Sequence, residues 1–195
     1  MAIHRRQWFS VFAVSGLALL SACAFTPAEL ELRPTVDAQA SDIGRGSTVA
    51  FKFVDERDDV TIGHRSVATV GAKISSQQLP TLVEEDLRDA LIRKHFTLIA
   101  PQQHSDVEVV YRLRSFKFDV ETGFWTGGRN ASAALAVDAR RKDESYDKVY
   151  RYNSEERILV VPTEIDINKQ MNEALSQILA QAATDKDLDR FLAGR

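Results

Sequence analysis

The residues that most clearly predict chemistry are Leu20-Ser21-Ala22-Cys23. Cys23 is the single cysteine of the 195-residue chain. Ser21 and Ala22 are small enough for a signal-peptidase pocket that excludes bulky side chains, and the thiol of Cys23 is a nucleophile that can accept a diacylglyceryl group. The pattern therefore predicts cleavage between Ala22 and Cys23, with a lipidated Cys23 as the new amino terminus.

The segment before this site has the composition of a secretory signal. His4, Arg5 and Arg6 supply positive charge, and no charged side chain occurs from Trp8 to Leu20. The apolar run is too short for a membrane span, which needs roughly 20 residues. The alternatives are an ordinary secretory signal with a chance cysteine, or a short anchor that is never cut. Arg5-Arg6 also suggests twin-arginine export, but the flanking residues match that signal only partly.

Acylation would attach the protein to a membrane without spanning it. Two or more acyl chains on Cys23 give stable attachment, whereas one gives only marginal binding. Ala24 follows the cysteine, where an aspartate would favour retention in the inner membrane of enterobacterial-type cells. By analogy with lipoproteins as a class, we expect an outer-membrane lipoprotein that faces the periplasm.

The length and charge of the remaining chain indicate a single acidic domain. Residues 1–22 contain two of the 25 basic residues and none of the 28 acidic ones, so the mature chain would have a net charge of about −5. That balance argues against a nucleic-acid partner, which needs a basic surface. With Cys23 acylated, no thiol remains for a disulfide or a cysteine metal site.

The expected organisation is a signal peptide over 1–22, a lipidated amino terminus and tether over 23–46, and a single α+β domain over 47–195. Pro27 and Pro34 interrupt the tether. Its apolar residues could form one short strand against the domain, while a disordered leash is the alternative for its first part.

Alternation of apolar and polar side chains predicts strands over residues 48–54, 106–120, 130–140 and 146–156. The apolar face changes phase near Arg114-Ser115, which indicates a β-bulge. The last three strands follow one another through short connections, as in an antiparallel meander.

Apolar stripes at helical spacing predict two long helices, Leu79 to Lys94 and Ile165 to Ala183. Strands with one apolar face need a cover, and both helices carry a matching stripe. We therefore expect an α+β fold with the two long helices packed on one face of an antiparallel sheet.

Local residue types predict where these helices begin and end. His95 can adopt the left-handed conformation that ends the first helix. Thr163 with Asp166 approximates a capping box for the second helix, and Thr184 with Asp187 repeats the arrangement before a short last helix.

No constellation typical of an enzyme is visible, so we expect no catalytic activity and no cofactor or metal. The histidines lack metal-ligand spacing. Asp55 to Asp59 contains four acids in five positions, but without the EF-hand spacing it is typical of a solvated turn. The Gly123 to Gly128 segment lacks the lysine and the helix of a phosphate loop.

Phe124 and Trp125 lie in that glycine-flanked connection between two strands. Exposed aromatic residues are favoured anchors at interfaces, so both are candidate contacts for a protein partner. The alternative is that Trp125 folds back and caps the core, since tryptophan is usually mostly buried.

The chain resembles the YajG family of bacterial lipoproteins, which has no assigned biochemical activity. The resemblance rests on Leu20 to Cys23, Glu31 to Pro34, Val54 to Arg57, Leu82 to Lys94 and Thr184 to Leu192. We expect a structural or adaptor lipoprotein that binds another envelope protein. The alternatives are a small binding module for a lipid, glycan or peptide, and a cell-wall hydrolase.

Overall fold

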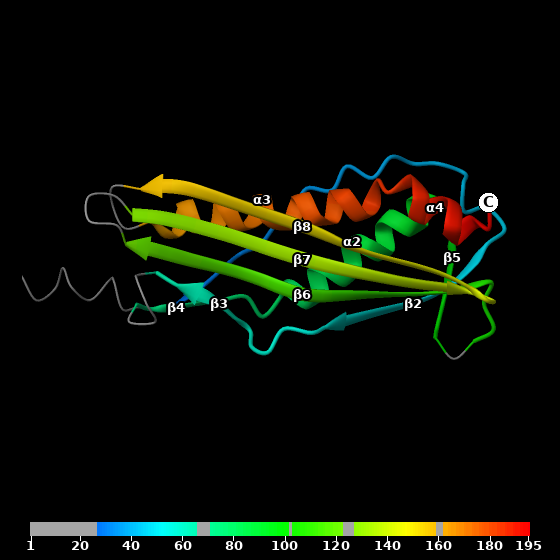
Figure 1. Ribbon diagram of the computed structural model, residues 1–195, viewed down its shortest axis with the longest axis horizontal. Helices are drawn as coiled ribbons and strands as arrows, with labels where there is room; N and C mark the ends of the chain where they lie inside the picture. The colour runs from blue at the N-terminus through cyan, green and yellow to red at the C-terminus, as the bar shows by residue number, and fades with distance from the viewer. Residues whose placement is uncertain (1–26, 66–70, 102, 123–126, 159–161) are drawn as a thin grey trace, which may run out of the picture.

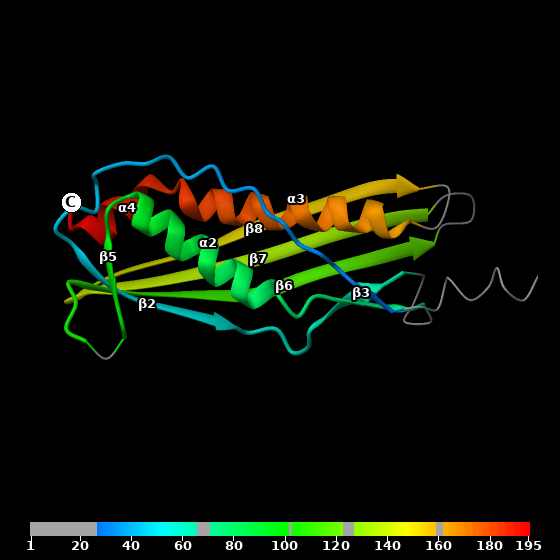
Figure 2. The same cartoon turned by 180° about the vertical axis from the view of Figure 1, so that it is seen from behind.

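A computed structural model of the chain describes residues 27–65, 71–101, 103–122, 127–158 and 162–195. It has an elongated α+β fold in which helices cover one face of an eight-stranded sheet (Figures 1 and 2). The predicted α+β class is confirmed. The elements are β1 (Ala28–Glu29), β2 (Thr48–Asp55), β3 (Thr61–His64), β4 (Lys73–Ser75), α2 (Leu79–Arg93), β5 (Thr97–Ile99), β6 (Val107–Thr122), β7 (Gly127–Arg141), β8 (Glu144–Ile158), α3 (Glu164–Ala183) and α4 (Lys186–Ala193).

The sheet is mixed, which corrects the expectation of an antiparallel sheet. Strands β6, β7 and β8 pair antiparallel. On the other side of β6, however, β2 pairs in parallel with both β6 and β5. The reason is that the chain between β2 and β5 passes through α2, and a helical crossover brings the next strand back in the same direction.

The bulge predicted in the long central strand is present. The register between β6 and β7 shifts between Leu113 and Ser115. Leu113 and Phe116 are nevertheless both buried, at 0% and 1% exposure. The extra residue therefore keeps the apolar side chains of β6 on the helix-covered face along its whole length.

Helix α3 packs on β7 and β8, while α2 packs on β2, β5 and α3. Leu87 of α2 and Leu175 of α3 are buried, and Glu85 lies on the exposed side of α2. His95 has the predicted left-handed backbone, with φ of 62°. Thr163 forms the predicted capping box with Asp166 at the start of α3.

Residues 30–46, which belong to the expected tether over 23–46, form an extended strap across the helices (Figure 2). Leu30 and Leu32 are buried in the main core. The backbone N–H of Thr35 donates to the Ser176 hydroxyl at 2.9 Å. Burial of these leucines favours attachment over a free leash, because each removes apolar surface from water.

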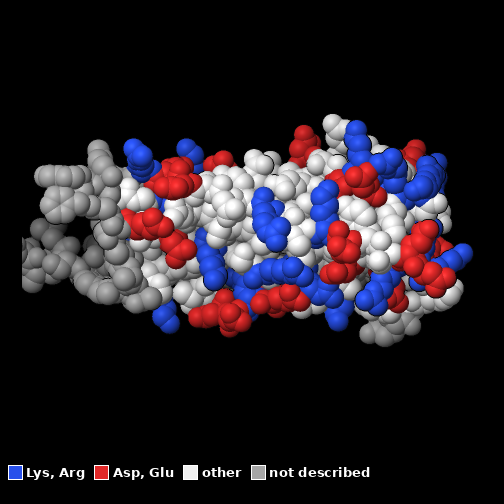
Figure 3. All heavy atoms as spheres, viewed as in Figure 1, with Lys and Arg blue, Asp and Glu red and all other residues white. Residues whose placement is uncertain are grey.

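The molecule has two distinct ends along the strands (Figure 1). The β1 end carries β1, β3 and β4, the ends of β6 and β8, and the start of α3. The α4 end carries β5, the β7–β8 turn, the ends of α2 and α3, and α4. No described element covers the sheet face away from the helices, which bears interspersed acidic and basic residues (Figure 3). Within the described ranges, no helix is both long and apolar enough to cross a membrane.

Candidate functional site

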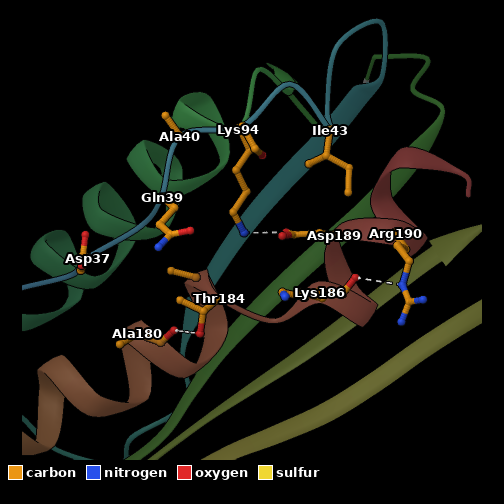
Figure 4. A pocket seen from close by; sticks show the side chains of 12 residues that line it. Asp37, Gln39, Ala40, Ile43, Lys94, Ala180, Thr184, Lys186, Asp189 and Arg190 are labelled. Carbon is orange, nitrogen blue, oxygen red and sulfur yellow. Dashed lines mark hydrogen bonds and ion pairs between the residues drawn. The ribbon is translucent and has the colours of Figure 1, made fainter.

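A groove of about 730 Å³ opens at the α4 end (Figure 4). Four separate parts of the chain form it. The strap contributes Asp37 and Gln39, the end of α2 contributes Lys94, and the end of α3 contributes Ala180. Helix α4 supplies the remaining wall, which includes Asp189. Its volume lies within the usual range of ligand pockets, roughly 300–1,000 Å³.

A buried ion pair crosses the groove between α2 and α4. The Lys94 ammonium donates to an Asp189 carboxylate oxygen at 2.6 Å, and the two residues are 4% and 8% exposed. Burial raises the pKa of Asp189, while the Lys94 charge acts in the opposite direction. Each charge compensates the other, so the pair holds α4 against α2.

Asp185 is the centre of a second polar cluster beside this pair. One of its carboxylate oxygens accepts hydrogen bonds from Tyr146 at 2.8 Å, Lys148 at 2.6 Å and Tyr150 at 2.9 Å. The other accepts from the backbone N–H groups of Asp187 and Leu188. Asp185 therefore accepts five hydrogen bonds and joins β8 to α4.

The N-cap of α4 is Asp185, which corrects the prediction of Thr184 with Asp187. The Thr184 hydroxyl instead donates to the Ala180 carbonyl at 2.7 Å, at the end of α3. Asp185 occupies the N-cap because its carboxylate accepts hydrogen bonds from backbone N–H groups of α4 and from three side chains of β8 at the same time.

The Asp185 cluster is held in fixed protonation states near neutral pH. Burial alone would raise the pKa of Asp185, but donation from Lys148, Tyr146 and Tyr150 outweighs it and lowers this pKa to about 2. Burial, followed by hydrogen bonding to Asp185, raises the pKa of both Tyr146 and Tyr150. None of these groups has a pKa shifted toward neutral pH, so the cluster suits a structural role better than general acid–base catalysis.

Asp185→Asn is expected to reduce stability at pH 7 by about 1–2 kcal/mol. The folded pKa of about 2 lies below the unfolded value of about 3.9. Ionised Asp185 thus stabilises the fold above the unfolded pKa, and this contribution is lost as the pH falls through the folded pKa. Urea denaturation between pH 7 and pH 2.5 measures the effect.

The variant should therefore show a smaller loss of stability between pH 4 and pH 2.5 than the unmodified protein. Asp143→Asn is the control, because Asp143 is exposed in the β7–β8 turn. Parallel pH profiles for the unmodified protein and Asp185→Asn would contradict the role assigned to Asp185.

Of the other residues singled out in the sequence, His95 lies at the end of α2. Ala22, Cys23, Phe124 and Trp125 lie outside the described residues. The His95 ring nitrogen Nδ1 lies 3.0 Å from the Ser41 carbonyl oxygen, where it ties the strap to the end of α2.

The acidic cluster at the end of β2 is partly neutralised. The Arg57 guanidinium contacts both carboxylate oxygens of Asp55, at 2.9 and 2.8 Å. Asp59 accepts from the Thr61 hydroxyl. No group of three or more metal-ligating side chains occurs within the described ranges. These contacts are those of a salt-bridged turn.

The sequence contained partial signs of the Asp185 cluster. Tyr146, Lys148 and Tyr150 alternate along a strand and so share a face, and Asp185 and Asp189 are four residues apart on one helical face. Nothing in either local pattern indicated that the two faces meet, because 35 residues separate Tyr150 from Asp185.

One solved structure that this chain resembles shares its fold. The structure of protein XCC0632 from Xanthomonas campestris matches with a TM-score of 0.51 and 14% identity over 82% of this chain and 93% of that chain. Rare lipoprotein B from Shewanella oneidensis matches with a TM-score of 0.38 and 11% identity over 75% of this chain and 92% of that chain. A search of curated proteins found no match. At 14% identity the first likeness shows a shared fold alone.

The structure defines the chain as an α+β domain in which helices cover one face of a mixed sheet. The sequence profile of the family Lipoprotein_16, described as an uncharacterised lipoprotein, matches residues 34–193 of this chain. The chain therefore belongs to this family, and the resemblance to YajG lipoproteins is confirmed.

Proposed function

We propose that this protein is a non-catalytic adaptor of the bacterial envelope, anchored to the outer membrane through acyl chains on Cys23 and facing the periplasm. Its domain binds a segment of another envelope protein in the groove at the α4 end. The observation that carries this proposal is the groove itself, which four separate parts of the chain build around the Lys94–Asp189 pair.

The chemistry of the groove supports binding over hydrolysis. Its buried lysine and aspartate neutralise each other, and the neighbouring Asp185 is engaged by five donors. A hydrolase needs a nucleophile or a base that is free to react and has a pKa matched to its task. The cell-wall hydrolase is therefore the weakest of the three functions considered.

The walls of the groove indicate the type of segment it would bind. Gln39 and Ser41 are exposed on the strap, where they can form hydrogen bonds with a peptide backbone. Lys186 and Arg190 are exposed on the α4 wall. This combination suits an extended peptide that carries an acidic side chain toward α4.

The volume of the groove also suits the alternative, a small binding module for a lipid, glycan or peptide ligand. An independently bound small molecule would remain with the purified protein and would be lost when a bulky residue fills the groove. Native mass spectrometry of the unmodified protein and of Ala180→Trp separates this alternative from protein binding.

The adaptor proposal is tested by photo-crosslinking in cells. A photoreactive amino acid placed at Gln39 should capture the same envelope protein as one placed at Lys186, since both face the groove. Combining the Gln39 reporter with Arg190→Glu and Lys186→Glu should reduce capture at least tenfold by reversing the charge of the α4 wall. The captured protein is identified by mass spectrometry, and its binding is then measured with purified components.

Lys52→Glu with Lys117→Glu is the matched control, because both lysines are exposed on the uncovered strands and the net charge change is the same. Capture should be unchanged in this control. Equal capture in both double variants, or different proteins at the two groove positions, would remove the groove as the adaptor site.

A further inference from the structure

The predicted lipid attachment site and the first described strand are close together in the chain. Five peptide units separate Cys23 from Ala28, which pairs with Ile74 of β4. Five residues span at most about 18 Å in any conformation. If Cys23 is acylated, as the proposed function requires, the β1 end is therefore held within this distance of the bilayer surface.

The attachment of β1 to the domain is firm. Beyond the strand pairing, the backbone N–H of Leu30 donates to the Ser75 carbonyl at 2.8 Å, and the Ser75 hydroxyl donates to the Glu29 carboxylate at 2.7 Å. Leu30 is only 1% exposed. The strap then runs away from this point toward the α4 end (Figure 2), so it adds no free length to the linker.

The same end exposes an apolar side chain. Ile165, in the first turn of α3, is 80% exposed, the highest value among the large hydrophobic residues that the structure describes. Asp166 beside it lies 3.7 Å from Arg129, near the start of β7, and this contact fixes the start of α3 at the β1 end. An exposed isoleucine close to an acyl anchor can enter the apolar part of the membrane interface.

We propose that the domain stands end-on to the bilayer, with the β1 end and Ile165 in contact with the lipid surface. The occupant of this surface is the membrane that holds Cys23. Because β7 has 15 residues at about 3.3 Å each, the α4 end and its groove extend roughly 50 Å from the β1 end, into the periplasm.

The uncovered sheet face is less suited to lie on the bilayer (Figure 3). Arg112 on this face pairs with Glu56 at 3.1 Å and also contacts Asp138. Arg114 lies 3.7 Å from Glu56. Placing these charges against lipid would remove water from them, which costs free energy.

Fluorescence quenching in vesicles tests this orientation with the full-length, lipidated protein. Because the native cysteine is acylated, a cysteine introduced at Ile165, Lys52 or Asp143 is the only free thiol for a fluorophore. These positions report on the β1 end, the sheet face and the β7–β8 turn. The vesicles contain phosphatidylethanolamine and phosphatidylglycerol with a nitroxide quencher on the acyl chains.

End-on contact predicts at least threefold stronger quenching at position 165 than at positions 52 and 143. Quenching at position 52 that equals or exceeds that at position 165 would show a domain lying on its sheet face, and equal weak quenching at all three would show a freely tumbling domain. Either result overturns the orientation and leaves the anchor intact. Failure of the protein to float with the vesicles would instead reject the lipid anchor, and the orientation with it.

Discussion

Cys23→Ala should abolish labelling by palmitate and remove the protein almost completely from the outer membrane. The sulfur of Cys23 is the atom that would carry the diacylglyceryl group. At least two acyl chains are needed for stable attachment. The variant should appear as an uncut precursor or as a soluble periplasmic protein. Membrane fractionation together with metabolic labelling measures both effects.

Ala24→Asp is the matched control because it changes the neighbouring residue and leaves the thiol in place. It should retain palmitate labelling, while the expected sorting rule predicts a shift from the outer to the inner membrane. Palmitate uptake and outer-membrane fractionation by Cys23→Ala would show that lipidation at this cysteine is wrong.

Leu175→Ala should lower the free energy of unfolding by about 2–5 kcal/mol, and Leu87→Ala by an amount in the same range. Both leucines are buried, at 0% and 2% exposure, where the helices meet the sheet and each other. Truncation removes apolar contacts and leaves a cavity that the surrounding side chains fill only partly. Denaturant unfolding followed by circular dichroism measures the change.

Glu85→Ala is the control on the outer side of α2, and it should change stability by no more than about 0.5 kcal/mol. Equal unfolding midpoints for Leu175→Ala and Glu85→Ala would mean that the buried and exposed faces of the helices are wrongly assigned. The expected difference is large because only the leucine sites exclude water in the folded state.

Patterns local in sequence predicted the main elements of this fold. The apolar spacing of α2 and α3 and the phase change near Arg114 each depend on residues that are neighbours along the chain. Helical and strand periods are set by backbone geometry, so a single window of sequence contains the necessary information. The capping box of Thr163 and the left-handed His95 belong to the same category.

The strap and the parallel strands required tertiary information. Leu30 and Leu32 were compatible with a leash, and their burial depends on surfaces that α2, α3 and β4 provide only after folding. The parallel pairing of β2 with β6 joins residues more than 50 positions apart. Short strands such as β5, with three residues, have too few side chains for a clear period.

The sequence by itself determined the predicted lipidation cysteine, the α+β class and the family resemblance, because each depends on local motifs or periodicity. Tertiary structure alone decided the site. It brought Lys94 to Asp189 and the β8 donors to Asp185, pairs separated by 95 and at least 35 positions. Such pairings depend on how helix ends and strand faces meet in three dimensions, and no local period in the chain encodes that meeting.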